Sequence, residues 1–265
     1  MRAMIAQPDR DAAALHFAGL RLTPRTVEQS VSALAGRDAA DPFAVYVTPN
    51  IEHIFLNRRR AELRAIYDGA FLSTNDSRIL HRMARFAGLE LEFAPGSYVT
   101  DRLFRGVIGP DDPITVIGGT AAVVETLKAQ FGVRRVAQHI PPMGFIHDPA
   151  AVEAAVEFVA RHPGRFVFVA MGPPQSELFC AKVIADGRST GLGLCIGSSL
   201  NVITGQSDPA PAWMEQSGLV WLYRLVREPR RLWRRYLVND MAGLALCARA
   251  VATSWLGRSS DGVRG

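Results

Sequence analysis

The chain has 265 residues, of which 48% are hydrophobic and 21% are charged, a balance that is typical of a globular protein and excludes a disordered one. This length suffices for one large domain, or for one domain with an appendage. The net charge of +5 is unevenly spread, and a cluster of arginines within a dozen residues favours a polyanionic partner. The cluster consists of Arg224, Arg227, Arg230, Arg231, Arg234 and Arg235.

The three cysteines, Cys180, Cys195 and Cys247, are far apart and have no CxxC spacing. This argues against a disulfide framework or a zinc site and indicates a reducing compartment. No apolar segment precedes Asp9 and Arg10, so we expect no signal peptide, and no window of about twenty residues is apolar enough to span a bilayer. We therefore expect a cytoplasmic protein, which can still contact a membrane surface.

The first 22 residues form a polar, alanine-rich leader to which we assign no structure. Thr23 and Pro24 are typical of a helix start, with Thr23 as the N-cap and Pro24 at the first helical position. An apolar run then predicts a strand at residues 43–47. The pattern that follows predicts one helix over residues 51–67, with its apolar side chains on or near one face.

A short apolar segment at residues 70–72 runs into Ser73-Thr74-Asn75-Asp76-Ser77. The next predicted helix covers residues 77–87 and stops at Gly88, a natural residue for a helix C-terminus. Asp76 is thereby placed as the N-cap of this helix, and its position alone favours this capping role over a functional one.

The remainder of the chain alternates between predicted strands and helices. The strands are at residues 114–117, 136–140, 166–170 and 192–196, and the helices are at residues 98–107, 121–131, 149–161 and 175–186. The run at residues 166–170 is unbroken and apolar, as expected for a strand that is buried on both faces.

Turns of one chemical kind follow five of these predicted strands. Because the carboxyl ends of parallel strands meet at one edge of a sheet, where open α/β sheets bind ligands, we expect these turns to form one site. The fold class predicted is α/β, with a Rossmann-like, mostly parallel sheet, flanking helices and a C-terminal helical appendage. The turns are Thr48-Pro49-Asn50, Asn75-Asp76-Ser77, Gly118-Gly119-Thr120, Gly172-Pro173-Pro174 and Gly197-Ser198-Ser199.

Gly118 and Gly119 precede a predicted helix, and the free backbone N–H groups at a helix start favour the binding of a phosphate at this turn. Their spacing is not GxGxxG, and no dinucleotide-binding fingerprint is present. Phe145 lies in a predicted loop at the same edge, where an aromatic ring either stacks on a base or fills a gap in the core. Core filling is the interpretation that this residue alone favours.

From Pro209 the alternation of strands and helices ends. We therefore expect three parts: a leader with its helix at residues 1–40, a core at 41–208 and an appendage at 209–265. The clustered arginines alternate with tryptophan and tyrosine in predicted helices at 219–227 and 229–255. This pattern fits an anionic membrane interface. It fits equally a pair of helices docked on the sheet with a solvated basic face. Nucleic acid is a lesser alternative, because no nucleic-acid-binding fold is recognisable.

The sequence resembles the WecG/TagA/CpsF family of bacterial glycosyltransferases over about residues 43–238. The most specific match is DPAPAWMEQSGLVWLYRLVREPRRLWRRYL, at residues 208–237, which is very similar to the C-terminal signature of that family. The segment GPPQSE at residues 172–177 is similar to the family's GxPxQE, and Thr48-Pro49-Asn50 is similar to its TxN. Asp76 falls in register with the family's catalytic aspartate.

The resemblance implies an inverting transfer of a sugar from a UDP-sugar to an undecaprenyl-diphosphate-linked acceptor, at the inner face of the cell membrane, in surface-glycan or exopolysaccharide synthesis. Asp76 is then the candidate general base, and no metal cofactor is expected. Gly118, Gly119 and arginines of the appendage would stabilise the diphosphate leaving group. The six clustered arginines would also bind the diphosphate of the acceptor and the membrane surface. The other substrate-binding residues implied are Thr48, Asn50, Phe145, Gly172, Pro174, Gln175, Ser176, Glu177 and Asn201.

The sequence departs from the family pattern at three places. Ser176 stands where the family has glutamine, Phe93 and Ala94 stand where it has an arginine, and Asn201 replaces an aspartate. Arg102 or Arg105 could replace the lost charge. These changes admit a donor hexose or uronic acid other than the family's usual N-acetylmannosamine.

Two other functions are compatible with the sequence. The departures are also those expected of a family member that has lost catalysis and serves as a nucleotide- or lipid-binding scaffold, although the presence of Asp76 argues against it. An oxidoreductase is disfavoured because the GxGxxG motif is missing. An apolar face of the appendage could also pair with a second subunit in a homo-oligomer.

Overall fold

The computed structural model describes residues 14–208 and 210–261. The first thirteen residues of the predicted leader, Pro209 and the last four residues of the chain lie outside the described part.

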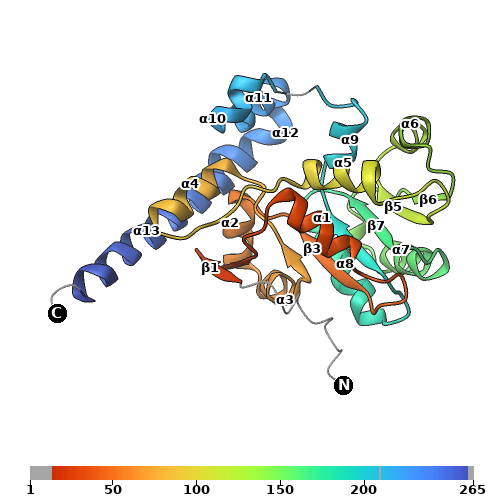
Figure 1. Ribbon diagram of the computed structural model, residues 1–265, viewed down its shortest axis with the longest axis horizontal. Coiled ribbons are helices and arrows are strands. Elements are labelled where there is room, and N and C mark those ends of the chain that lie inside the picture. Colours follow the sequence, from red (N-terminus) through yellow and green to blue (C-terminus); the bar gives the residue numbers. More distant parts are fainter. Residues whose placement is uncertain (1–13, 209, 262–265) are drawn as a thin grey trace.

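The core of the fold is a six-stranded sheet whose strands are all parallel, in the order β4-β3-β8-β7-β5-β6 (Figure 1). The residues of β3, β8 and nearly all of β7 are buried, as their continuous apolar runs predict for strands covered on both faces. The predicted α/β class is therefore confirmed. The strands are β3 (Ala44–Val47), β4 (Leu72–Ser73), β5 (Ile114–Gly118), β6 (Val136–His139), β7 (Phe166–Ala170) and β8 (Leu192–Cys195).

Helices cover both faces of this sheet and form two separate apolar cores. One face is covered by α2 (Ile51–Arg59), α3 (Ala61–Gly69), α4 (Arg78–Phe86), α7 (Pro149–Arg161) and α8 (Gln175–Asp186). The other is covered by α1 (Val27–Ala35), α5 (Gly96–Gly106), α6 (Ala121–Phe131) and α9 (Ser199–Ile203). A single-turn 3-10 helix, η1 (Phe145–His147), precedes α7.

The N-terminal segment holds a hairpin that was not predicted, formed by β1 (Leu15–Phe17) and β2 (Leu20–Leu22). The hairpin packs against the edge strand β4. Directly after β2, the backbone N–H of Thr23 donates to the Ser73 carbonyl oxygen of β4 at 2.7 Å. Thr23 makes this contact and does not cap α1, so the prediction of Thr23 as the N-cap is wrong. The helix begins three residues later, where Thr26 and Gln29 form a reciprocal capping box.

The single helix predicted over residues 51–67 is instead two helices, α2 and α3, with Arg60 extended between them at φ −129° and ψ 106°. The two segments pack against different partners: α2 contacts the C-terminal helices, whereas α3 contacts β2 and α8. One straight helix could not contact both sets, so tertiary packing overrides a continuous apolar pattern.

The C-terminal appendage consists of α10 (Ala212–Ser217), α11 (Val220–Arg227), α12 (Pro229–Arg234), a π-helical turn η2 (Arg235–Asp240) and α13 (Met241–Asp261). Figure 1 shows α10, α11 and α12 grouped beyond one end of α13, which runs alongside α4. Cys247 is buried in the core, and the Trp255 indole nitrogen donates to the Phe86 carbonyl oxygen at 2.7 Å. Within the described ranges, none of the helices combines the length and hydrophobicity needed to cross a bilayer.

Gly243 sets how closely α13 approaches the sheet domain. A Cβ atom at this position would lie 2.4 Å from the Ile51 carbonyl oxygen, whereas one at Gly106, the last residue of α5, would meet nothing within 4 Å. We expect Gly243→Ala to lower the free energy of unfolding by about 1–3 kcal/mol despite the higher helix propensity of alanine, because backbone atoms must move apart. Chemical denaturation of both variants checks this, and equal stability of Gly243→Ala and the control Gly106→Ala would contradict it.

Candidate functional site

Four segments that are distant in sequence meet at the carboxyl edge of the sheet. The Thr48 hydroxyl, after β3, donates to the Cys195 carbonyl oxygen, at the end of β8, at 3.2 Å. Gly96, at the start of α5, lies so close that a Cβ there would be 3.1 Å from Thr48 Oγ1 and 3.3 Å from Ser199 Oγ. The backbone N–H of Gly96 in turn faces Asp76, after β4. The predicted convergence of strand ends therefore exists for Thr48 and Asp76.

Asp76 is not the N-cap of α4, and the capping role that its position favoured is wrong. The helix begins at Arg78, and the hydroxyl of Ser77 accepts the hydrogen bond from the Leu80 N–H at 3.2 Å. The Asp76 carboxylate instead accepts a hydrogen bond from the Gly96 N–H at 3.3 Å, and the residue is half-buried. The carboxylate is thus positioned by the loop before α5 and is not used to start a helix.

Burial raises the pKa of Asp76 to about 6, and four groups oppose that rise: Arg224, the N–H of Gly96, His53 and Arg235. A carboxyl group with this pKa is ionised at neutral pH, yet it accepts a proton more readily than an ordinary aspartate. These are the properties required of a general base that works near pH 7.

The six clustered arginines divide into two groups. Arg224 on α11 and Arg235 on η2 are partly buried and act electrostatically on Asp76. The other four are exposed. Arg227 pairs with Asp208 and Arg231 with Glu228, whereas within the described part of the chain Arg230 and Arg234 have no side-chain hydrogen bond or ion pair. Of the six arginines, Arg224 and Arg235 are thus the two that act on Asp76.

Glu52 connects the appendage to this edge, a contact that the sequence did not predict. Its side chain lies in the first turn of α2 and is almost fully buried, with 6% of the residue exposed. Its carboxylate pairs with Arg235 at 2.9 Å and accepts a hydrogen bond from the Asn239 amide at 3.2 Å. Its position two residues after the Thr48-Pro49-Asn50 turn was the available signal, but its burial depends on η2 and could not be inferred from local sequence.

Asn50 and Glu177, two predicted substrate-binding residues, belong to a second buried network together with His53. Asn50 caps α2 by accepting from the Glu52 N–H at 3.0 Å, and its amide oxygen lies 2.8 Å from His53 Nδ1. His53 Nε2 lies 3.4 Å from the Glu177 carboxylate, which also accepts from Tyr67 at 3.3 Å and Ser176 at 3.0 Å.

Burial alone would raise the pKa of Glu177. The opposing groups outweigh burial and hold that pKa below its usual range: they are the hydrogen bond and charge of His53, the backbone N–H of Glu177 and the Ser176 hydroxyl. Ser176 and Glu177 are each 2% exposed. Their contacts stabilise the start of α8 from beneath the sheet edge, so the structure does not present either side chain to a ligand.

The turn after β5 depends on the glycines predicted there. Gly118 and Gly119 adopt positive φ angles of 86° and 68°, and a Cβ on Gly118 would lie 2.9 Å from Met171 Cγ. The Gln138 amide donates to the carbonyl oxygens of Gly118 at 3.0 Å and Thr120 at 3.1 Å, which fixes the turn. This brings its backbone against the end of β7.

Other predicted site residues lie along the same edge. Gly172 is exposed, Pro174 and Gln175 are half-buried after β7, and Asn201 is half-buried on α9. Phe145, in contrast, is only 4% exposed, and its ring centroid lies 6.0 Å from that of Phe179. Phe145 fills the core, so its predicted position near a nucleotide is not supported.

Among the described residues, no group of three or more histidine, cysteine, aspartate or glutamate side chains is placed to hold a metal ion. The groups that act on Asp76 at this edge are Arg224, the Gly96 N–H, His53 and Arg235.

Comparison with known protein families identifies a match over most of the chain. The model of the family described as Glycosyl transferase WecG/TagA/CpsF matches residues 15–256, which include the hairpin, the whole parallel sheet and nearly all of the appendage.

The electrostatic environment of Asp76 can be measured directly. We expect its carboxyl carbon to titrate with a midpoint near pH 6 in NMR, and Arg224→Met to raise that midpoint, because a nearby cation stabilises the ionised form. The control Arg227→Met removes an exposed arginine that pairs with Asp208 and should leave the midpoint unchanged. An ordinary midpoint near pH 4, or equal effects of the two variants, would contradict this description of the site.

Proposed function

The chain belongs to the WecG/TagA/CpsF family of glycosyltransferases, and we propose that it transfers a hexose-type sugar from a UDP-sugar to a polyprenyl-diphosphate-linked acceptor with inversion. The observation that carries this proposal is the position of Asp76, a half-buried carboxylate that is free of helix capping, has a raised pKa and is electrostatically coupled to two arginines of the appendage.

In the proposed reaction, the Asp76 carboxylate takes the proton from an acceptor hydroxyl. The hydroxyl oxygen attacks the anomeric carbon of the donor while the bond from that carbon to the diphosphate oxygen breaks. The bonding pair leaves with UDP, whose added negative charge is stabilised by Arg224 and Arg235. Attack opposite to the leaving group gives the inverted product.

Arg224 and Arg235 are suited to this role because both lie close enough to lower the pKa of Asp76, and Arg235 is held by the buried Glu52. A guanidinium is planar and always charged, so it suits a diphosphate. The Gly118-Gly119 turn offers backbone at the same edge of the sheet.

The proposal places the appendage at an anionic membrane surface, where a lipid-linked acceptor resides. Large apolar side chains are exposed along α10, α11, α12, η2 and the start of α13, and the exposed Arg230 and Arg234 lie among them. Aromatic rings at headgroup depth with cations on lipid phosphates are typical of peripheral membrane helices. The apolar side chains are Trp213, Leu222, Val226, Trp233, Leu237, Val238 and Met241.

Loss of the carboxylate should remove most of the activity. With a panel of UDP-hexoses, we expect Asp76→Asn to slow UDP release by on the order of 10²- to 10⁴-fold, the usual contribution of a general base. In the wild type, the rate should fall below about pH 6, because protonation of Asp76 removes the base. Asp68→Asn changes an exposed aspartate on α3 and serves as the control.

Equal rates for Asp76→Asn and the control would overturn the assignment of the base. A folded protein that releases no UDP from any UDP-hexose, with acceptor lipid present, would favour the alternative of a nucleotide- or lipid-binding scaffold.

Membrane attachment is tested with vesicles that contain anionic phospholipid. We expect the wild type to float with the vesicles and the double variant Trp233→Ser, Val226→Ser to lose most of this binding, because each removes exposed apolar area. The matched control Phe86→Ser removes an exposed aromatic ring on α4. Flotation that is equal in both variants would contradict attachment through this face.

A further inference from the structure

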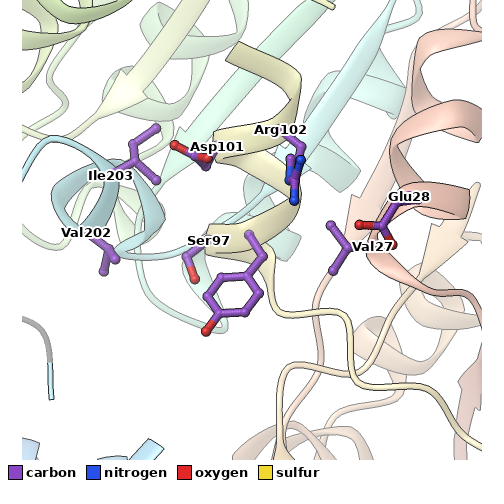
Figure 2. A pocket seen from close by; sticks show the side chains of 8 residues that line it. Val27, Glu28, Ser97, Asp101, Arg102, Val202 and Ile203 are labelled. Carbon is purple, nitrogen blue, oxygen red and sulfur yellow. The ribbon is translucent and has the colours of Figure 1, made fainter. Parts of the chain in front are cut away.

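A cleft of about 480 Å³ lies between three helices on the face of the sheet that is covered by α1, α5 and α9. Its walls carry Glu28 from α1, Ser97, Tyr98 and Arg102 from α5, and Val202 and Ile203 from α9. Figure 2 shows the labelled side chains of the three helices around one common gap, with Glu28 and Arg102 on different walls. None of these residues has a role in the reaction described above.

One lining residue of the cleft, Ser97, is the sequence neighbour of the residue that contacts Asp76. Ser97 directly follows Gly96, whose N–H donates to the Asp76 carboxylate at 3.3 Å. Because an α-helix rises about 1.5 Å per residue, Arg102 lies roughly 7.5 Å farther along α5 than Ser97. The cleft therefore leads away from the proposed base over a distance that accommodates a hexose ring.

The charges that line the cleft are balanced. Asp101, which also lines it, is paired with Arg105 at 2.8 Å, so its charge is compensated within α5. Within the described part of the chain, neither Glu28 nor Arg102 has a side-chain hydrogen bond or ion pair. One carboxylate and one guanidinium thus remain to bind a ligand, and together they favour an uncharged ligand over a uronic acid.

The lining combines these polar groups with apolar walls. A carboxylate accepts hydrogen bonds from sugar hydroxyls, a guanidinium donates to their oxygens, and Ser97 can do either. Val202, Ile203 and the ring of Tyr98 offer apolar surface for the C–H faces of a sugar. The hydroxyl of Tyr98 donates to Glu215 of α10, so the appendage is fastened at this wall of the cleft.

We propose that this cleft is a subsite for a neutral hexose ring of one of the two substrates, with Arg102 and Glu28 as specificity-determining residues. The inference rests on the proposed function and names the ligand class of one part of the same site. The ring belongs either to the donor or to the acceptor, and the experiment below distinguishes these sources.

The test is a saturation-transfer NMR titration of the full chain with glucose, galactose, N-acetylglucosamine and glucuronic acid. We expect at least one neutral sugar to bind, and Arg102→Ala and Glu28→Gln each to weaken it by on the order of tenfold, since each removes a hydrogen bond to a charged group. Arg64→Ala, which changes an exposed arginine on α3, is the control and should stay within about twofold of the wild type. Thermal melting verifies that each variant is folded.

The proposal is overturned if no neutral sugar binds the wild type, if glucuronic acid binds more tightly than every neutral sugar, or if Arg102→Ala and Arg64→Ala have equal effects. Repeating the titration with saturating UDP-hexose identifies the source. A sugar that still binds occupies an acceptor subsite, and one that UDP-hexose displaces but UDP does not occupies the donor subsite.

Titration of UDP into the same wild-type samples separates this inference from the proposed function. UDP binding without sugar binding would overturn the subsite alone. Sugar binding without UDP binding would overturn the UDP-sugar donor and leave the cleft as a saccharide site.

Discussion

Glu52 and Arg235 are a pair of charges that neither segment could bury alone. A carboxylate with 6% exposure is costly unless a cation and hydrogen-bond donors compensate it, and here these come from Arg235 and Asn239 of the π-helical turn. Removing the Arg235 guanidinium would leave the buried Glu52 carboxylate without this cation. The pair therefore fixes the appendage to the start of α2, and thereby holds two arginines beside Asp76.

The composite site follows from this constraint. The sheet alone provides Asp76 and a loop that orients it through Gly96, but the cations that tune its pKa come from α11 and η2. The buried network of Asn50, His53 and Glu177 lies beneath and stabilises the turns after β3 and β7. Of the residues predicted for the site, Asn50 and Glu177 stabilise the backbone of the turns, whereas Asp76 lies at the carboxyl edge of the sheet.

Much of the fold could be predicted because strands that are buried on both faces and capped helices leave local signals, as at residues 166–170 and 121–131. What could not be predicted depends on distant partners. Thr23 and Thr26 are equally good N-caps by residue type, and the contact of Thr23 with β4 decides between them. The break at Arg60 depends on the packing of α13 on α2, which is distant in sequence. Asp76 and Ser77 are both good caps, and only the register of α4 decides between them. For Glu52, a polar residue in a first helical turn is ordinarily exposed, and nothing local predicts the arginine that buries it.

The most direct test of the account is a calorimetric titration of the full chain, without added metal, with UDP, GDP, TDP and NAD. We expect UDP to bind, because the sheet edge with backbone N–H groups and the guanidinium groups of Arg224 and Arg235 is proposed to hold a diphosphate. We expect UDP to bind more tightly than GDP, TDP or NAD, because the proposed donor is a UDP-sugar. Binding of NAD in preference to UDP, or no binding of any diphosphate by a folded chain, would contradict it.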